Sequence, residues 1–165
     1  NLQKQYLAEA RFLRAYYHFA LAQMFGEIPA IKEILGPDVI TPRTPADELY
    51  TFILDDLKFC AENGINTPYS AMKFENWGRA TKWAAESMMA RVYLYYTGYY
   101  GQESLGEYTN ASILNTVQDC IDNSGHDLVP EFASVAFNLQ DKKRVSKIVE
   151  TEYGFHIIQL IVALL

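Results

Sequence analysis

A long, almost wholly apolar helix pattern near the start of the chain constrains the fold most. It runs from Ala8 to Pro29 and reads AEARFLRAYYHFALAQMFGEIP. Apolar residues recur three or four apart on one side, and further apolar residues fill the opposite side. A helix that is apolar all round has to be covered on most faces, so we expect other helices to pack around it. Gly26 suits the left-handed position after the last turn, and Pro29 stops the helix from continuing.

Composition favours one folded domain and argues against nucleic acid as a partner. Half of the 165 residues are hydrophobic, which excludes a disordered chain. The net charge of −6 lacks the basic surface that nucleic acid requires. The sequence has no glycine-rich phosphate loop, and no apolar run is long enough to span a membrane.

The cysteines and histidines predict no metal site and no cofactor. Cys60 and Cys120 each fall within a predicted helix, far apart in the chain. They could form one disulfide, but their spacing suggests neither metal nor redox chemistry, so we interpret them as buried free thiols. The three histidines are scattered, and no nucleophile, base and orienting group occur at motif spacing. We therefore expect no catalytic residues.

A second helix has a clear predicted start and end. The Thr44 hydroxyl can cap it, Pro45 fits its first position, and Asp47 can complete a capping box. Its acidic residues lie mostly off the apolar stripe and are interpreted as a solvated face. Asn63 and Gly64 end it.

Two more helices complete the helical part. The third is predicted over residues 79–97, and the fourth begins at Asn110 or Ser112 and ends at Ser124–Gly125. Leu13 of the first helix and Met88 of the third are predicted to be buried between helices. The fold class expected is mainly α, with two antiparallel helix pairs of the tetratricopeptide type, followed by a short helix and a small β tail.

Three segments of the helical part resemble one known family, in the right order. EARFLRAYYHFALAQMFGEIP is similar to the helix that opens the helical-repeat core of SusD/RagB-type proteins. GRATKWAAESMMARVYLYY (78–96) resembles the family's next long helix, and TPRTPADELYTFILDDLKFC (41–60) resembles the connecting helix. The resemblance covers about residues 1–130, roughly a quarter of a usual member.

This resemblance implies a function and a location. SusD/RagB-type proteins are nutrient-binding lipoproteins of the Bacteroidetes outer membrane. The intact parent would bind glycans or other nutrients at the cell surface and pass them to a SusC-like, TonB-dependent transporter. The chain shows no signal peptide and no lipid-accepting cysteine near its start, so we expect it to be a fragment without leader and anchor.

Two aromatic loops are the candidate glycan-binding sites, since loops tend to carry the ligand contacts in SusD-like proteins. The candidates are Tyr69, Phe74 and Trp77 in one loop, and Tyr99, Tyr100 and Tyr108 in the other. Sugars stack on flat rings that have hydrogen-bonding neighbours. Two plainer interpretations stay open: the tyrosines pack between helices, and Trp77 anchors its loop onto the third helix.

After Gly125 the sequence changes in character. A short amphipathic helix is predicted over 128–139, then a basic turn at 142–144 and a β-branched strand over 154–158. LVPEFASVAFNLQ…VSKIVETEYGFHIIQLI resembles the C-terminal part of parvulin-type peptidyl-prolyl isomerases. We therefore delimit residues 1–127 as a SusD-like segment and 128–165 as a partial parvulin-like tail.

The parvulin resemblance implies remnants of a proline pocket. Leu128 and Phe132 would line it, and Thr151 and His156 would belong to the histidine network beneath it. Residues 1–127 lack the family's earlier histidine strand and its middle segment in a matching context, so we expect no isomerase activity. The two resemblances overlap near Leu128–Ala133, and the joining of two partial genes there could be natural, an assembly error or engineered.

Three functions compete on the sequence. Non-catalytic glycan or nutrient binding by a SusD-like segment rests on the longest resemblance. Peptidyl-prolyl isomerisation rests on the tail alone. A helical-repeat scaffold that binds only protein is the third.

Overall fold

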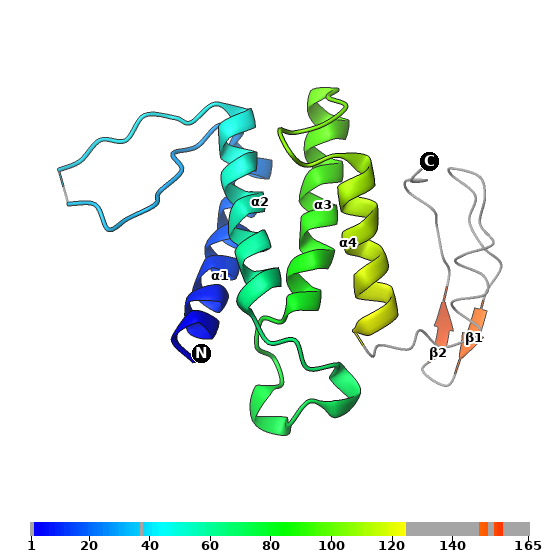
Figure 1. The fold of residues 1–165 in the computed structure, drawn as a ribbon. Helices are drawn as coiled ribbons and strands as arrows, with labels where there is room; N and C mark the ends of the chain where they lie inside the picture. Colours follow the sequence, from blue (N-terminus) through cyan, green and yellow to red (C-terminus); the bar gives the residue numbers. More distant parts are fainter. Residues whose placement is uncertain (1, 37, 125–148, 152–153, 157–165) are drawn as a thin grey trace. The chain divides into compact units, whose positions relative to one another are not determined.

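A computed structural model describes residues 2–36, 38–124, 149–151 and 154–156. The chain divides into two compact units, Asn1–Ser124 and Gly125–Leu165. The first unit is helical (Figure 1) and contains α1 (Leu2–Phe25), α2 (Ala46–Asn63), α3 (Lys82–Tyr100) and α4 (Asn110–Asn123). Described elements of the second unit are β1 (Val149–Thr151) and β2 (Gly154–His156). The prediction of a mainly α fold is confirmed.

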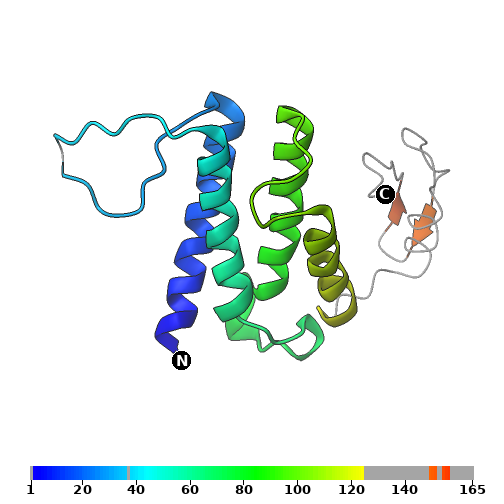
Figure 2. The same ribbon diagram turned by 45° about the horizontal axis from the view of Figure 1, so that its top comes forward.

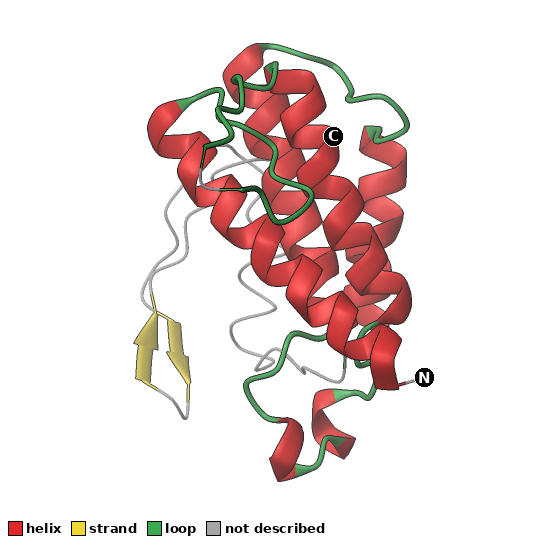
Figure 3. Cartoon of the chain, turned by 90° about the vertical axis from the view of Figure 1, so that its left-hand side faces the viewer, coloured by secondary structure: helices red, strands yellow, loops and turns green. Residues whose placement is uncertain are grey.

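The four helices lie side by side in chain order, each antiparallel to the one before it (Figure 2). Figure 3 shows how the loops join them at the two ends of the bundle. No helix of the described residues has the length and apolar character needed to cross a membrane.

The core lies along α2, which packs against α1 on one side and α3 on the other. Leu49, Tyr50, Ile53, Leu54 and Leu57 of α2 are fully buried. Their spacing places them on one side of the helix, as the sequence predicts. Aromatic rings join the three helices here, since Phe19 of α1 meets Tyr50 and Tyr95 edge-on.

The prediction that α1 is covered on most faces is wrong for the described residues. Ala8, Ala15, Phe19 and Ala22 are buried. Leu13, which was predicted to be buried, is 50% exposed, and other apolar side chains on the outward face are exposed too. α1 lies at the edge of the helical layer and its main neighbour is α2, so only one side is covered. Met88 is partly buried and packs against the core.

Helix ends confirm part of the sequence analysis and correct part of it. Gly26 follows α1 at a φ of 72°, the left-handed conformation predicted for it, and its N–H donates to Ala22 O. Thr44 does not cap α2, which has no side-chain cap. Its Oγ1 instead accepts from the Ala30 N–H at 2.9 Å, because the 26–45 connector folds back on itself there.

α3 and α4 begin with well-formed caps. Thr81 Oγ1 accepts from the Ala84 N–H, so α3 starts three residues later than predicted. Thr109 and Ser112 form a reciprocal capping box at the start of α4, which begins at Asn110, the first of the two predicted starts.

The second unit contains an antiparallel hairpin, which agrees with the predicted small β tail over the part that the structure describes. Val149 pairs with His156, Glu150 with Phe155, and Thr151 with Gly154. The predicted helix over 128–139 and the residues Leu128 and Phe132 lie outside the described residues.

Candidate functional site

The loop between α2 and α3 is held in place at both ends by backbone hydrogen bonds. The Lys82 N–H donates to Ile65 O at 2.8 Å, and the Tyr69 N–H donates to Ser124 O at 2.9 Å. Between these points the chain makes two short 3-10 turns, Tyr69–Ala71 and Phe74–Asn76. The loop is therefore a defined structure that can present side chains in fixed positions.

Three aromatic rings of this loop lie together, and we call Tyr69, Phe74 and Trp77 the aromatic loop cluster. Tyr69 stacks on Trp77 with ring centroids 6.1 Å apart and an interplanar angle of 24°. Phe74 lies 5.3 Å from Trp77 at 58°. The three side chains are 47%, 81% and 53% exposed. Large rings that contact one another yet stay exposed are typical of a binding surface.

Trp77 is held by a hydrogen bond within its own loop. Its Nε1–H donates to Met72 O at 3.3 Å, and Gly78 continues the chain at a φ of 79°. Beside it, the Asn76 Oδ1 accepts from Arg79, whose guanidinium also forms a 2.7 Å ion pair with Glu9 of α1. The ring thus has a fixed position and a polar neighbour.

The second group of candidates does not form a comparable surface. Tyr108 is buried, and its hydroxyl donates to Asp55 Oδ1 at 2.7 Å. Its ring is therefore not exposed for the glycan contact that was predicted. Tyr100 is half-buried against Tyr50 and Tyr96. Tyr99 alone stays open, at 70% exposure, and stacks on Tyr95 at 5.5 Å.

The two aromatic groups lie at opposite ends of the bundle. The aromatic loop cluster precedes α3, and Tyr99 lies in the last turn of that helix. Figures 1 and 2 show that the two ends of α3 lie at opposite ends of the bundle. A helix of 19 residues is about 28 Å long, so the two groups cannot contact one small ligand. The structure therefore separates residues that the sequence analysis treated alike.

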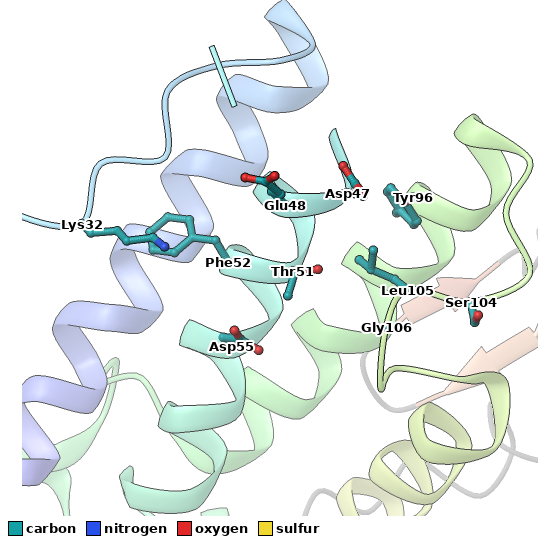
Figure 4. A pocket seen from close by; sticks show the side chains of 10 residues that line it. All are labelled: Lys32, Asp47, Glu48, Thr51, Phe52, Asp55, Tyr96, Ser104, Leu105 and Gly106. Carbon is teal, nitrogen blue, oxygen red and sulfur yellow. The ribbon is translucent and has the colours of Figure 1, made fainter. Parts of the chain in front are cut away.

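A cavity of about 560 Å³ lies between α2, the connector and the 101–108 loop (Figure 4), and the sequence analysis did not predict it. Asp47, Glu48 and Asp55 of α2 line it together with Lys32, whose Nζ lies 5.8 Å from the Phe52 ring centroid. These carboxylates were predicted to be solvated, and they are exposed. The cavity exists because the 101–108 loop folds against α2, which helix periodicity does not reveal.

The prediction that the acidic residues of α2 form a solvated face is wrong for one carboxylate. Asp56 is only 2% exposed and accepts from Arg14 Nε and Nη2 at 2.6 and 2.8 Å. The hydrogen bond to Asp56 raises the pKa of Arg14. Asp56 lies next to Leu57 and three residues after Ile53, in phase with the buried stripe, and this spacing was the available signal. The pair joins α1 to α2.

Reactive groups are few in the described part of the chain. Both cysteines are free, and burial raises the pKa of the Cys60 thiol to about 12, which keeps it protonated and inert. Cys120 is half-buried. Within the described ranges no three histidine, cysteine, aspartate or glutamate side chains are grouped to hold a metal ion. Of the isomerase remnants, Thr151 and His156 have a described backbone in β1 and β2.

The tail matches a second family model. Residues 106–162 match the PPIC-type peptidyl-prolyl isomerase domain, a match that begins before α4 rather than at Leu128. It covers about a third of the chain and overlaps none of the first family's matched residues.

The helical part matches a family described as "Starch-binding associating with outer membrane", over residues 2–94. A SusD-like protein of Bacteroides ovatus is 27% identical over 128 residues, which are 76% of this chain and 22% of that protein. A SusD-like protein from Bacteroides fragilis has a solved structure with a TM-score of 0.61 and 26% identity, over 78% of this chain and 22% of that one.

A further solved structure, with xylogluco-oligosaccharide, shares the fold at a TM-score of 0.64 and 24% identity, over 93% of this chain and 31% of that one. The chain spans about a fifth of the length of the curated relatives it matches. More than half of its residues match the family model, and the resemblance found in the sequence is thereby confirmed. The chain belongs to the SusD-like family.

Proposed function

We propose that the chain is a non-catalytic, glycan-binding segment of a SusD-like protein at the outer membrane. The intact protein would pass the glycan to a SusC-like, TonB-dependent transporter. The family's own description, starch binding in association with the outer membrane, supports this proposal. Substrate, partner and location are properties of whole SusD-like proteins, and this chain spans about a fifth of the length of the relatives that it matches.

The aromatic loop cluster is the observation that carries the proposal. A pyranose has an apolar face and a rim of hydroxyls, so it binds well to a flat exposed ring beside hydrogen-bonding groups. Trp77 offers such a ring, with Tyr69 stacked on one side and the Asn76 side chain nearby. Tyr99, at the far end of α3, would act as a separate, weaker contact.

A tryptophan fluorescence titration with starch and other plant glycans tests the proposal. The chain has two tryptophans, and Trp83 is buried at 8% exposure, so a glycan should change the emission of Trp77 alone. Trp77→Phe should abolish the emission change, and Trp77→Ala should weaken binding by tenfold or more. This loss is scaled from the stacking of a nucleic-acid base on an aromatic side chain, which is worth about 1–3 kcal/mol.

Tyr17→Ala is the matched control, because it removes an exposed ring of α1 that is not among the candidate glycan contacts. It should leave the Trp77 titration unchanged. Full-strength binding by Trp77→Ala would contradict the assignment of the site. Silence of the wild-type chain with every glycan would favour the protein-binding scaffold, for which the exposed apolar side of α1 is the available surface.

Peptidyl-prolyl isomerisation is the second candidate, because residues 106–162 match that family's domain. We propose that this chain does not catalyse it, since the sequence lacks the first part of the family's pocket. A proline-isomer exchange assay on a short peptide should show no acceleration. A robust rate that falls in His156→Ala would establish the enzyme instead.

A further inference from the structure

A second cavity, of about 230 Å³, lies between α2, α3, α4 and the loop that precedes α4. It is separate from the aromatic loop cluster and shares no lining residue with the larger cavity of Figure 4. Met89 and Ile113 give it an apolar wall, and three carboxyl groups, those of Glu62, Glu86 and Glu107, are among its other lining groups. Its size suits a ligand of a few heavy atoms.

The charges around this cavity are unbalanced. Lys58 of α2 lies 2.9 Å from Glu107, so that carboxylate is already paired. Glu62 of α2 is exposed at the cavity and Glu86 of α3 is buried. Three carboxyl groups and one ammonium group line the cavity, so its charge is negative even when Glu86 carries a proton, and a negative wall attracts a cation.

Glu86 is the unusual member. It is 5% exposed, and its Oε2 has no hydrogen-bond partner among the described residues. Its Oε1 lies 3.6 Å from Lys82 Nζ, but Lys82 is closer to Asp119 of α4, at 2.6 Å. A buried carboxylate oxygen without a donor costs free energy, and a cation or a proton relieves that cost.

Without a ligand, Glu86 is partly protonated at neutral pH. Burial, together with the neighbouring Asp119 carboxylate, raises its pKa to about 7 against the lowering effect of Lys82. About half of the molecules therefore carry a proton on Glu86 at neutral pH. A cation that binds beside Glu86 must displace this proton.

We propose that this cavity binds a small organic cation through its primary ammonium group, with Glu86 and Glu62 as the charge partners. A primary ammonium group has three donors, which suits carboxylate oxygens and the Thr116 hydroxyl, whose own hydrogen is donated to Ser112 O. The carbon skeleton of the ligand would lie on Met89 and Ile113. A metal ion fits less well, because the described part of the chain has no group of three ligating side chains. This proposal does not depend on glycan binding by the aromatic loop cluster.

Isothermal titration calorimetry of the full chain with n-propylammonium chloride is the test. Propan-1-ol, which has the same skeleton without the charge, and sodium chloride are the ligand controls. We expect saturable binding of the ammonium alone. Titration in phosphate and in HEPES, neither of which has a primary amine, measures proton release over the pH range in which both buffers work. We expect about half a proton at pH 7, about three quarters of a proton at pH 6.5 and about a tenth at pH 8.

Two variants and a control complete the experiment. Glu86→Gln should weaken binding at least tenfold and abolish proton release, and Glu62→Gln should weaken binding several-fold. Glu48→Gln removes an exposed carboxylate of the other cavity and should change neither. If Glu86→Gln fails to fold, Glu62→Gln and the proton release of the wild-type chain decide. No saturable binding, or wild-type affinity in both cavity variants, would overturn the proposal.

Discussion

The two aromatic regions that flank α3 each contribute three candidate rings, but their structures are opposite. In the loop before α3, the rings of the aromatic loop cluster contact one another and stay exposed. In the loop after α3, Tyr108 turns inward and donates to Asp55 of α2, and the Lys58–Glu107 ion pair adds a second link to the same helix. An aromatic residue near a loop therefore indicates a binding surface only when it is not packed against a neighbouring helix. Packing of this kind requires apolar contacts for the ring and a polar partner for its hydroxyl.

The largest difference in stability is expected between an alanine variant of Tyr108 and one of Phe74. Tyr108→Ala empties a buried position and leaves Asp55 without its donor, so it should lower the free energy of unfolding by about 3–5 kcal/mol. Phe74→Ala, at 81% exposure, should change it by about 0.5 kcal/mol or less. Urea unfolding followed by the helical circular dichroism signal measures both. Equal losses would show that the two loops are packed alike.

A pH effect should follow from the cavity beneath the second loop. The pKa of Glu86 rises from 4.5 to about 7 on folding, so the folded chain binds the proton more tightly than the unfolded chain. The free energy of unfolding should therefore fall as the pH rises from about 4.5 to 7, by at most about 3 kcal/mol.

Glu86→Gln should remove that decrease, and the variant should be more stable than the wild type at pH 8. The pKa of Asp119 is lowered by its contact with Lys82, so its contribution is lost only below its ordinary value of 3.8, outside this window. Stability that rises with pH between 4.5 and 7 would contradict a Glu86 carboxyl group whose pKa is raised by burial.

A smaller effect should come from the capping box that ends the second loop. Thr109→Ala removes an acceptor for the Ser112 N–H and should cost about 1 kcal/mol. Ser70→Ala, an exposed residue in a turn of the first loop, is the matched control and should cost almost nothing. Both are measured by thermal unfolding. A loss in Ser70→Ala as large as that in Thr109→Ala would show that the first loop also depends on local capping.

The smallest effect tests the same contrast between covered and open apolar residues on the helices. Leu13→Ala, on the open side of α1, should change stability by about 0.5 kcal/mol or less. Leu57→Ala, at zero exposure in α2, should cost about 2–5 kcal/mol. A cost of several kcal/mol at Leu13 would mean that the outward face of α1 is covered in solution.

Local patterns predicted the helices and several of their ends. The left-handed Gly26, the start of α4 at one of its two predicted positions and the predicted β tail each depend on residues within a few positions of one another, and the described residues agree with all three. The family resemblance also came from contiguous segments, and the match over residues 2–94 confirms it. Such features are fixed by backbone conformation and short-range hydrogen bonds, which neighbouring residues control.

Only the tertiary structure decided which polar and aromatic side chains meet. Thr44 was available as a cap, but the folded connector supplied the Ala30 N–H instead. Asp56 and Tyr108 each found a partner more than forty residues away in the chain, Arg14 and Asp55. The exposure of Leu13 depends on which helices lie beside α1. The sequence by itself determined the helices and the family, while burial, ion pairing and cavities were decided by long-range packing, because they depend on residues that no local pattern brings together.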